Sequence, residues 1–353
     1  MASKELKIKV VDLFCGIGGL THGLFKEGLE VVAGYDIDED CRYAYEANND
    51  CDFVAKDIKE VTSKEIKKLY TGADVSVLVG CAPCQPFSTY SFKTQDKNKW
   101  RLLNEFGRLI QEVKPDIVSM ENVPRLASFK KEPVFHNFLD LLSDSGYKYD
   151  YNIVNCAEFG VPQNRKRLVL VASRIGEIKF QVKKLKPEKF KTVKDAIGKI
   201  APITHGQTHE KDRLHRSAKL NDINLKRIKQ SVPGGSWKDW DEELLLACHK
   251  RDSGKSYVSV YGRMQWDKPS PTITTHCTGI GNGRFGHPDQ DRGISLREAA
   301  ILQSFPKKYK LLKSSEKLQV RTLSRHIGNA VPVKLGRAIG KCIKSHINDL
   351  HND

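Results

Sequence analysis

The sequence GCAPCQPFS places two cysteines, Cys81 and Cys84, directly after the short apolar run Val75–Val79. A cysteine at the end of a buried strand can be a nucleophile, a metal ligand or half of a redox pair. Zinc would need a second ligand pair close by, but the nearest pair of histidines lies about 120 residues further on. A redox dithiol usually opens a helix, whereas a proline on each side of Cys84 favours a rigid loop. The pattern therefore favours Cys84 as a lone nucleophile.

Two other polar motifs lie beside apolar runs of strand length. Glu121 ends the run Ile117–Met120, where a carboxylate could face the ring nitrogen of an electrophile and exchange a proton with it. In the segment QNRKR, Arg165 and Arg167 alternate, so both can project together from an extended backbone. The alternatives stay open at this point, because Glu121 could cap a helix and the arginines could form a solvated edge.

A fourth motif is the glycine-rich turn Cys15–Gly19, which follows an apolar run and precedes a helical pattern. Glycines let a ligand approach the backbone, and the N-terminus of the next helix offers free N–H groups. Asp36 ends the next strand about 20 residues on, where a carboxylate can bind ribose hydroxyls. Asp57 follows a third strand and could accept from an adenine amino group. Together these residues indicate an adenosine-containing cofactor, and because position 21 is not glycine a dinucleotide is disfavoured. A purely structural turn stays open as the alternative.

The elements that must position these residues alternate along the first half of the chain. Unbroken apolar runs suit a parallel sheet that is buried on both faces. We expect strands at 7–14, 30–36, 75–79, 117–120 and 168–172, with helices up to residue 26 and at 39–48 and 100–113. This alternation is typical of a doubly wound α/β domain, in which the carboxyl ends of the strands meet at one edge.

The pattern changes after Arg174. The segment 179–199 is rich in lysine, and the chain to about residue 282 is rich in Gly, Pro, Ser, Thr and His without sustained periodicity. A smaller, loop-rich second domain fits this composition better than more βα units. Helical patterns return at 296–303 and 333–347.

Composition narrows the class of protein. The chain has 353 residues, of which 39% are hydrophobic and 29% charged, and no apolar window is long enough to span a membrane. The start lacks the apolar core of a secretory signal, and nine cysteines in such a chain indicate free thiols in a reducing cytosol. Residues 163–230 carry 19 Lys or Arg against 6 Asp or Glu, which is 13 of the 16 net positive charges. This excess favours a polyanion partner over a merely solvated face.

In their order along the chain, these motifs resemble those of the DNA cytosine-5 methyltransferases of bacterial restriction–modification systems. The resemblance covers nearly the whole chain, because residues 297–306 (REAAILQSFP) and 328–333 (GNAVPV) match later segments of the family. It implies a Rossmann-like, S-adenosylmethionine-dependent methyltransferase sheet at 1–175. It also implies a target-recognition domain and hinge at 176–323, and a C-terminal segment, 324–353, that returns to the catalytic domain.

The resemblance also implies site residues. The catalytic set is Cys84, Glu121, Arg165 and Arg167. The cofactor set is Phe14, Gly16, Gly18, Gly19, Leu20, Asp36, Ile37, Asp57, Ile58, Pro83, Leu102, Asn329 and Ala330, and no metal is expected. By analogy with the family, Cys84 adds to C6 of a cytosine flipped out of duplex DNA while Glu121 holds N3 and the exocyclic amine. C5 then takes the methyl group from S-adenosylmethionine, which leaves as S-adenosylhomocysteine. The two arginines hold the base or its phosphate and orient Glu121.

Three other functions remain as alternatives: an RNA (tRNA) cytosine-5 methyltransferase, a catalytically silent DNA-binding module, and a dithiol oxidoreductase using both cysteines of the first motif. The family resemblance favours double-stranded DNA as partner and a monomer without membrane contact in the bacterial cytoplasm, associated with the nucleoid. A cognate restriction endonuclease would act on the same site without direct contact. The recognition sequence is not readable from the residues.

Overall fold

The computed structural model describes residues 6–83, 100–129, 133–254 and 256–352. The chain divides into two compact units. Unit 1 consists of Met1–Phe159, Lys166–Lys184 and Val331–Asp353, and unit 2 of Gly160–Arg165 and Leu185–Ala330. The sequence placed the divisions after 175 and 323, whereas the two units divide after Lys184 and Ala330, and it did not separate residues 160–165 from the first domain. That short segment belongs to unit 2 because its polar side chains find their hydrogen-bond partners there.

Unit 1 is built on a seven-stranded sheet in the order β3-β2-β1-β4-β5-β7-β6. Neighbouring strands are parallel except at β7, which runs antiparallel to both β5 and β6. This is the mostly parallel sheet that the sequence predicted. The strands are β1 (Ile8–Leu13), β2 (Glu30–Asp36), β3 (Asp52–Ala55), β4 (Val75–Gly80), β5 (Ile117–Asn122), β6 (Lys148–Asn155) and β7 (Lys166–Ser173).

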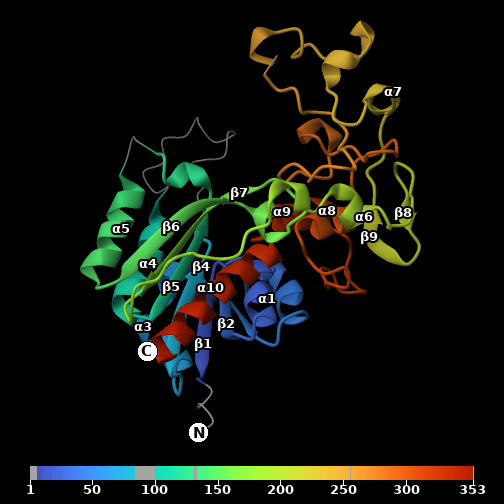
Figure 1. Cartoon of the computed structure of the whole chain (residues 1–353). Helices are drawn as coiled ribbons and strands as arrows, with labels where there is room; N and C mark the ends of the chain where they lie inside the picture. Colours follow the sequence, from blue (N-terminus) through green and yellow to red (C-terminus); the bar gives the residue numbers. More distant parts are fainter. Residues whose placement is uncertain (1–5, 84–99, 130–132, 255, 353) are drawn as a thin grey trace. The chain divides into compact units, whose positions relative to one another are not determined.

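Helices cover this sheet in two groups. One group packs in series along the chain, and the other pairs the first helix with the last (Figure 1). The first and last helices can approach closely because residue 23 is glycine. A Cβ at this position would lie only 2.5 Å from the carbonyl oxygen of Val333. The series is α3 (Ser63–Leu69), α4 (Arg101–Val113) and α5 (Val134–Asp144), the pair is α1 (Gly19–Lys26) and α10 (Val333–Asn352), and a short α2 (Arg42–Glu46) precedes β3.

The core of unit 1 lies between the sheet and the apolar face of α4. Phe106, Leu109 and Ile110 on this helix are fully buried, as the helical spacing in the sequence predicted. Each such side chain contributes about 1.5–3 kcal/mol by leaving water. Strand β5 is buried at every position, so the polar side chains at its end, Glu121 and Asn122, are shielded from water. One expected helix is wrong in extent: residues 39–48 form a 3₁₀ turn followed by the five-residue α2.

Unit 2 is rich in loops, as predicted. Its described residues form α6 (Val193–Ile197), α7 (Asp222–Gln230), α8 (Leu296–Leu302), α9 (Val320–Asn329) and a small hairpin of β8 (Thr208–His209) and β9 (Asp212–Arg216). The sequence did not predict α6, α7 or α9. Helix α7 buries Ile228 alone, so its apolar period is weak. Its start is marked instead by Asn221, whose side chain accepts from the N–H of Asn224.

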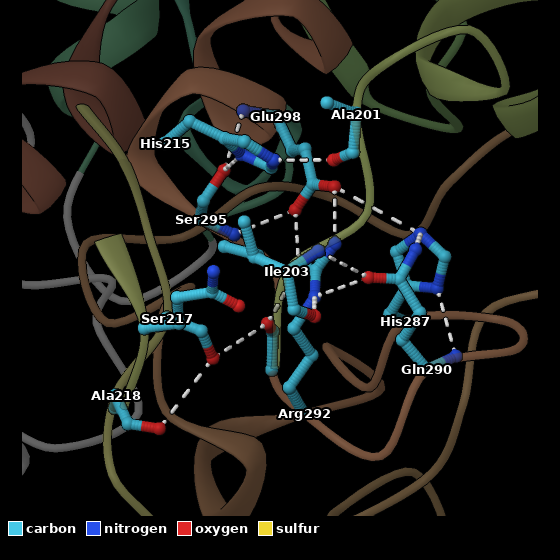
Figure 2. A network of polar contacts seen from close by, with 12 residues as sticks. Ala201, Ile203, His215, Ser217, Ala218, His287, Gln290, Arg292, Ser295 and Glu298 are labelled. Atoms are coloured by element: carbon cyan, nitrogen blue, oxygen red, sulfur yellow. Dashed lines mark hydrogen bonds and ion pairs between the residues drawn. The ribbon is translucent and has the colours of Figure 1, made fainter. Parts of the chain in front are cut away.

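A buried polar network gives unit 2 a fixed interior (Figure 2). The guanidinium of Arg292 is fully buried and donates to both carboxylate oxygens of Glu298, at 2.7 and 2.8 Å. Burial pushes the pKa of Glu298 upward, but Arg292 more than offsets it, so this pKa lies below its usual value. Burial lowers the pKa of His287, 3.8 Å from Glu298, to about 4. A loop-rich unit with few helices is thus held together by paired charges rather than by apolar packing alone.

Among the described residues, no helix is both long and apolar enough to cross a membrane.

Candidate active site

The turn between β1 and α1 has three residues with positive φ: Phe14 at 59°, Gly16 at 51° and Gly18 at 80°. Left-handed backbone explains why glycine occupies the last two positions. Gly18 is the N-cap residue of α1 and has no side chain that could accept a hydrogen bond from the first turn. The first backbone N–H groups of the helix are therefore not capped by a side chain. The expected cofactor residues Gly19 and Leu20 are the first two of this helix and are buried. The turn therefore offers backbone donors to a ligand at the carboxyl edge of the sheet.

Asp36, at the end of β2, is tied to this turn. One carboxylate oxygen accepts from the N–H of Gly16 and the other from the N–H of Asp38, both at 2.9 Å. Its neighbour Ile37 is 70% exposed, which leaves an apolar surface at the sheet edge. The sequence predicted Asp36 as a ribose ligand, and the structure adds that this carboxylate also shapes the glycine turn.

Asp57 and Ile58 follow β3 at the same edge. The carboxylate of Asp57 caps a 3₁₀ turn by accepting from the N–H of Lys59 at 3.1 Å. This backbone hydrogen bond is the largest of the effects that lower the pKa of Asp57. Ile58 is buried beneath it. Asp57 is thus an ionised acceptor in a fixed position, as an adenine contact would require.

The sequence analysis missed Asp12, a carboxylate buried within β1. Its Oδ2 accepts from the hydroxyl of Thr21 at 2.7 Å, and that hydroxyl lies 3.0 Å from the hydroxyl of Tyr45. Its Oδ1 has no hydrogen-bond partner within the part of the chain that the structure describes. Burial raises the pKa of Asp12 to about 7. The signal available in the sequence was an acid inside an otherwise apolar strand, directly before the glycine turn.

The ends of β4 and β5 bring the cysteine motif and Glu121 together. Gly80 pairs with Met120 in the parallel ladder, so the next residues, Cys81 and Glu121, lie side by side. The Cys81 thiol donates to Oε2 of Glu121 at 2.8 Å, and Nε of Arg167 lies 2.9 Å from Oε1. Glu121 is only 3% exposed. This buried carboxylate thus has an ion-pair partner at one oxygen and a hydrogen-bond donor at the other.

The loop that leads to the expected nucleophile is anchored to the same strand. Asn122 donates from its side-chain amide to the carbonyl oxygen of Ala82 at 3.1 Å. Pro83 follows and is exposed. Cys84 lies outside the described residues, so its placement stays a prediction. Leu102, at the start of α4, packs half-buried against the core of unit 1.

Arg165 needs a correction. The sequence predicted that it projects together with Arg167, but the two have separate roles in separate units. Arg165 is buried in unit 2 and donates to the carbonyl oxygens of Ile273 and Gly328, at 2.9 and 3.0 Å. Its two terminal nitrogens thus contact backbone carbonyls of unit 2, and a contact of Arg165 with the base or its phosphate stays a prediction.

The expected cofactor residues Asn329 and Ala330 follow Gly328 in unit 2. The carbonyl oxygen of Ala330 accepts from the amide of Gln303 at 2.7 Å, and Gln303 in turn accepts from Gln163 at 2.6 Å. Gln163 and Arg165 of the QNRKR segment thus both support residues 328–330. Asn329 itself is exposed.

In unit 1, the candidate residues lie at the topological switch point of the sheet. Strands β1 and β4 are neighbours whose connections lead away in opposite directions, and ligands of open α/β sheets bind at such a point. The glycine turn and Asp36 lie on one side, and Glu121 with Arg167 on the other. A family profile described as C-5 cytosine-specific DNA methylase matches residues 8–345, nearly the whole chain.

The chain belongs to the C-5 cytosine-specific DNA methylase family. The resemblance inferred from the order of the motifs is thereby confirmed, and the chain is a DNA cytosine-5 methyltransferase. The type II methylase M.HgiDII of Herpetosiphon aurantiacus is 54% identical over 342 residues, covering 97% of this chain and 96% of the relative. The type II methyltransferase M.Sau96I of Staphylococcus aureus is 28% identical over 367 residues, and the match covers 99% of this chain and 78% of the relative.

Solved structures share the fold of this C-5 cytosine methylase. A putative DNA modification methyltransferase encoded within an E. coli prophage superposes with a TM-score of 0.74 at 22% identity, covering 97% of this chain and 99% of the other. The Spodoptera frugiperda DNMT2 mutant gives a TM-score of 0.64 at 19% identity, with 95% and 99% covered. At these identities the similarity shows the fold alone, and it confirms the predicted Rossmann-like architecture.

Proposed function

We propose that this methyltransferase moves a methyl group from S-adenosylmethionine to C5 of a cytosine in a specific duplex DNA sequence, through a covalent bond between Cys84 and C6. The observation that carries the proposal is the buried carboxylate of Glu121, held by Arg167 next to the loop that leads into Cys84. The 54% identity to a type II methylase supports a role as the modification enzyme of a restriction–modification system.

The glycine turn of unit 1 fits S-adenosylmethionine. Gly16 and Gly18 expose backbone where a side chain would be strained, and Ile37 presents an apolar surface to an adenine ring. The carboxylates of Asp12 and Asp36 would favour a cofactor that carries sulfonium and ammonium charges, and Oδ1 of Asp12 has no hydrogen-bond partner in the described residues. When bound, S-adenosylmethionine supplies the methyl group and accepts the electron pair of the carbon–sulfur bond.

The protein's own residues must make C5 of cytosine nucleophilic. The Cys84 thiolate forms a bond to C6, and the electron pair of the C5–C6 double bond becomes available at C5. A proton shared between Glu121 and N3 neutralises the negative charge that this addition places on the ring, and the other oxygen of Glu121 accepts from the exocyclic amine. After C5 is methylated, a water-mediated base removes the C5 proton, the double bond re-forms and Cys84 leaves as a thiolate. Arg167 keeps Glu121 in place throughout.

DNA binding is assigned to the exposed basic run, Lys179–Lys229. Of its 15 Lys and Arg residues, all except Arg227 are exposed. Exposed cations of one sign are suited to neutralising phosphates. The target cytosine is then flipped out of the helix, because C6 is inaccessible in stacked DNA. Loops between Ser231 and Thr278 are proposed to read the base edges.

Transfer of a labelled methyl group to a mixture of duplexes, single strands and transfer RNA tests the substrate class. Duplex DNA should be labelled, whereas labelling of transfer RNA alone would favour the RNA methyltransferase alternative. Bisulfite sequencing of DNA from an expressing host then identifies the recognition sequence. Labelling of neither nucleic acid would contradict the proposal.

Replacement of the nucleophile tests the mechanism. Cys84→Ser should abolish methyl transfer, because a hydroxyl is essentially un-ionised near neutral pH, while DNA binding should persist. The matched control is Cys342→Ser, which replaces a thiol of α10 in unit 1, outside the proposed site, and should leave the rate unchanged. Near-normal turnover by Cys84→Ser would contradict the covalent mechanism.

A further inference from the structure

Cys81 contacts the carboxylate that the reaction is proposed to use. Its backbone N–H donates to the carbonyl oxygen of Leu13 at 3.3 Å, which fixes the residue between β1 and β5. Its Sγ lies 2.8 Å from Oε2 of Glu121. This separation is well inside ordinary sulfur–oxygen contact, so the thiol hydrogen lies between the two atoms. The contact is a hydrogen bond and not just packing.

The two partners of Glu121 lie at different oxygens. Nε of Arg167 forms an ion pair with Oε1 at 2.9 Å, but Oε1 accepts no hydrogen bond in the described structure, whereas the thiol of Cys81 donates to Oε2. The terminal torsion of a glutamate is broad, and an ion pair without a hydrogen bond leaves the carboxylate free to turn. The hydrogen bond from Cys81 therefore fixes the plane of the carboxylate. Each oxygen still has a lone pair for a hydrogen bond to the base.

A role confined to holding the loop is already filled by another residue. Asn122 donates to the carbonyl oxygen of Ala82 and anchors the loop to β5 without any help from a thiol. Cys81 is only half-buried, so it is not a core residue chosen for apolar packing. Its thiol instead reaches across the sheet edge to the one carboxylate there with a proposed chemical role.

We propose that Cys81 is a positioning residue for Glu121, which aims Oε2 at the exocyclic amine of the target cytosine. The inference rests on the proposed function, because it takes Glu121 as the group that binds the base. The thiol uses one lone pair of Oε2, and the amine N–H is bound by another. Loss of the thiol lets the carboxylate turn, and the base is then held less well at the moment of addition to C6.

The test compares wild type with Cys81→Ala, Cys81→Ser and Cys81→Val on two matched duplexes. One carries 5-fluorocytosine at the target position and the other 5-fluoro-2-pyrimidinone, which is the same base without its exocyclic amine. Fluorine at C5 prevents elimination, so the single-turnover rate of the covalent adduct with Cys84 can be measured for both. Cofactor affinity shows that each variant is folded, and Cys342→Ala, in α10 of unit 1, controls for removal of a thiol.

On the cytosine duplex, Cys81→Ala and Cys81→Val should form the adduct about tenfold more slowly with an unchanged KM for DNA, as loss of one hydrogen bond to a charged group predicts. Cys81→Ser retains a donor and should recover most of the rate. On the duplex whose base lacks the amine, all variants should come close to wild type. Equal slowing on both bases, or no slowing at all, would overturn the role of Cys81.

Glu121→Ala separates the two hypotheses. If Glu121→Ala slows the adduct on cytosine while Cys81→Ala does not, the proposal for Cys81 fails and the proposed function stands. If Glu121→Ala leaves the rate unchanged, the role of Glu121 fails, and the inference about Cys81 fails with it.

Discussion

Nε of Arg167 lies 2.9 Å from Oε1 of Glu121, and the two residues come from neighbouring antiparallel strands. Glu121 is opposite Val169 in this ladder, and Arg167 is two residues away, on the same face of the sheet. Both side chains are largely buried, at 3% and 13% exposure. Removal of the guanidinium would leave this buried carboxylate without its ion-pair partner.

Arg167→Ala should therefore lower the single-turnover rate of methyl transfer by on the order of 100-fold, the effect of removing one preorganised partner of a reacting group. Arg167→Lys keeps the charge but loses the planar donor, and it should recover only part of the rate. The neighbouring Lys166→Ala, at an exposed position, is the control. An undiminished rate in Arg167→Ala would contradict the role given to the ion pair.

Asp36→Ala should weaken binding of S-adenosylmethionine by roughly 1–3 kcal/mol, measured by calorimetry. The variant loses the ribose contact and also the acceptor that holds the N–H of Gly16. Asp40→Ala, an exposed acid four residues on, should bind the cofactor normally. Tighter binding of NAD than of S-adenosylmethionine by the wild type would show that the cofactor has been wrongly identified.

Asp12 should make the stability of the free protein depend on pH. Its pKa is about 7 in the folded protein and 3.8 in an unfolded chain, so the folded state holds an extra proton between these values. The stability that this proton provides is complete below pH 4 and is lost as the pH rises to 7. The total change is on the order of 4 kcal/mol if no other group responds.

Denaturant unfolding between pH 5 and 8 measures this effect. Asp12→Asn keeps the shape of the protonated acid, so its stability should change less over this interval than that of the wild type. Asp52→Asn, at an exposed position of β3, should follow the wild type. Parallel pH profiles for wild type and Asp12→Asn would show that Asp12 does not titrate there.

Much of the framework was predictable because it depends on local patterns. Apolar runs marked β1, β2, β4 and β5, and the carboxyl ends of such strands necessarily meet at one edge. The meeting of the glycine turn, Asp36 and Glu121 follows from that geometry. The loop-rich character of unit 2 followed from its Gly and Pro content.

What could not be predicted depends on partners far apart in the sequence. Arg165 donates to a carbonyl 163 residues away, and nothing near it distinguishes it from the arginine two positions on. Arg292 was not singled out, although its buried pair with Glu298 holds unit 2 together (Figure 2). The contact of Cys81 with Glu121 was not predicted, because that hydrogen bond depends on the register of β4 and β5.

The exposed basic run makes a prediction that separates affinity from specificity. Lys189, Lys191 and Lys194 lie in unit 2, are exposed and form none of the ion pairs found in the described structure. Reversal of all three to glutamate should weaken binding to every DNA sequence alike. It should also flatten the dependence on salt by about one unit of log–log slope for each phosphate that the protein no longer neutralises.

Binding isotherms at several salt concentrations test this prediction. The matched control reverses Lys67 and Lys68 in the last turn of α3, which are also exposed but lie outside the basic run. These two changes alter the net charge, but they remove no cation that is proposed to bind phosphate. Their effect should therefore be limited to long-range attraction, and the log–log slope of affinity against salt should stay near that of the wild type. The methylated sequence should be the same in all three proteins, because the basic run binds phosphates and not base edges. If the slope is unchanged in the triple variant, the run is a solvated face and DNA is bound elsewhere.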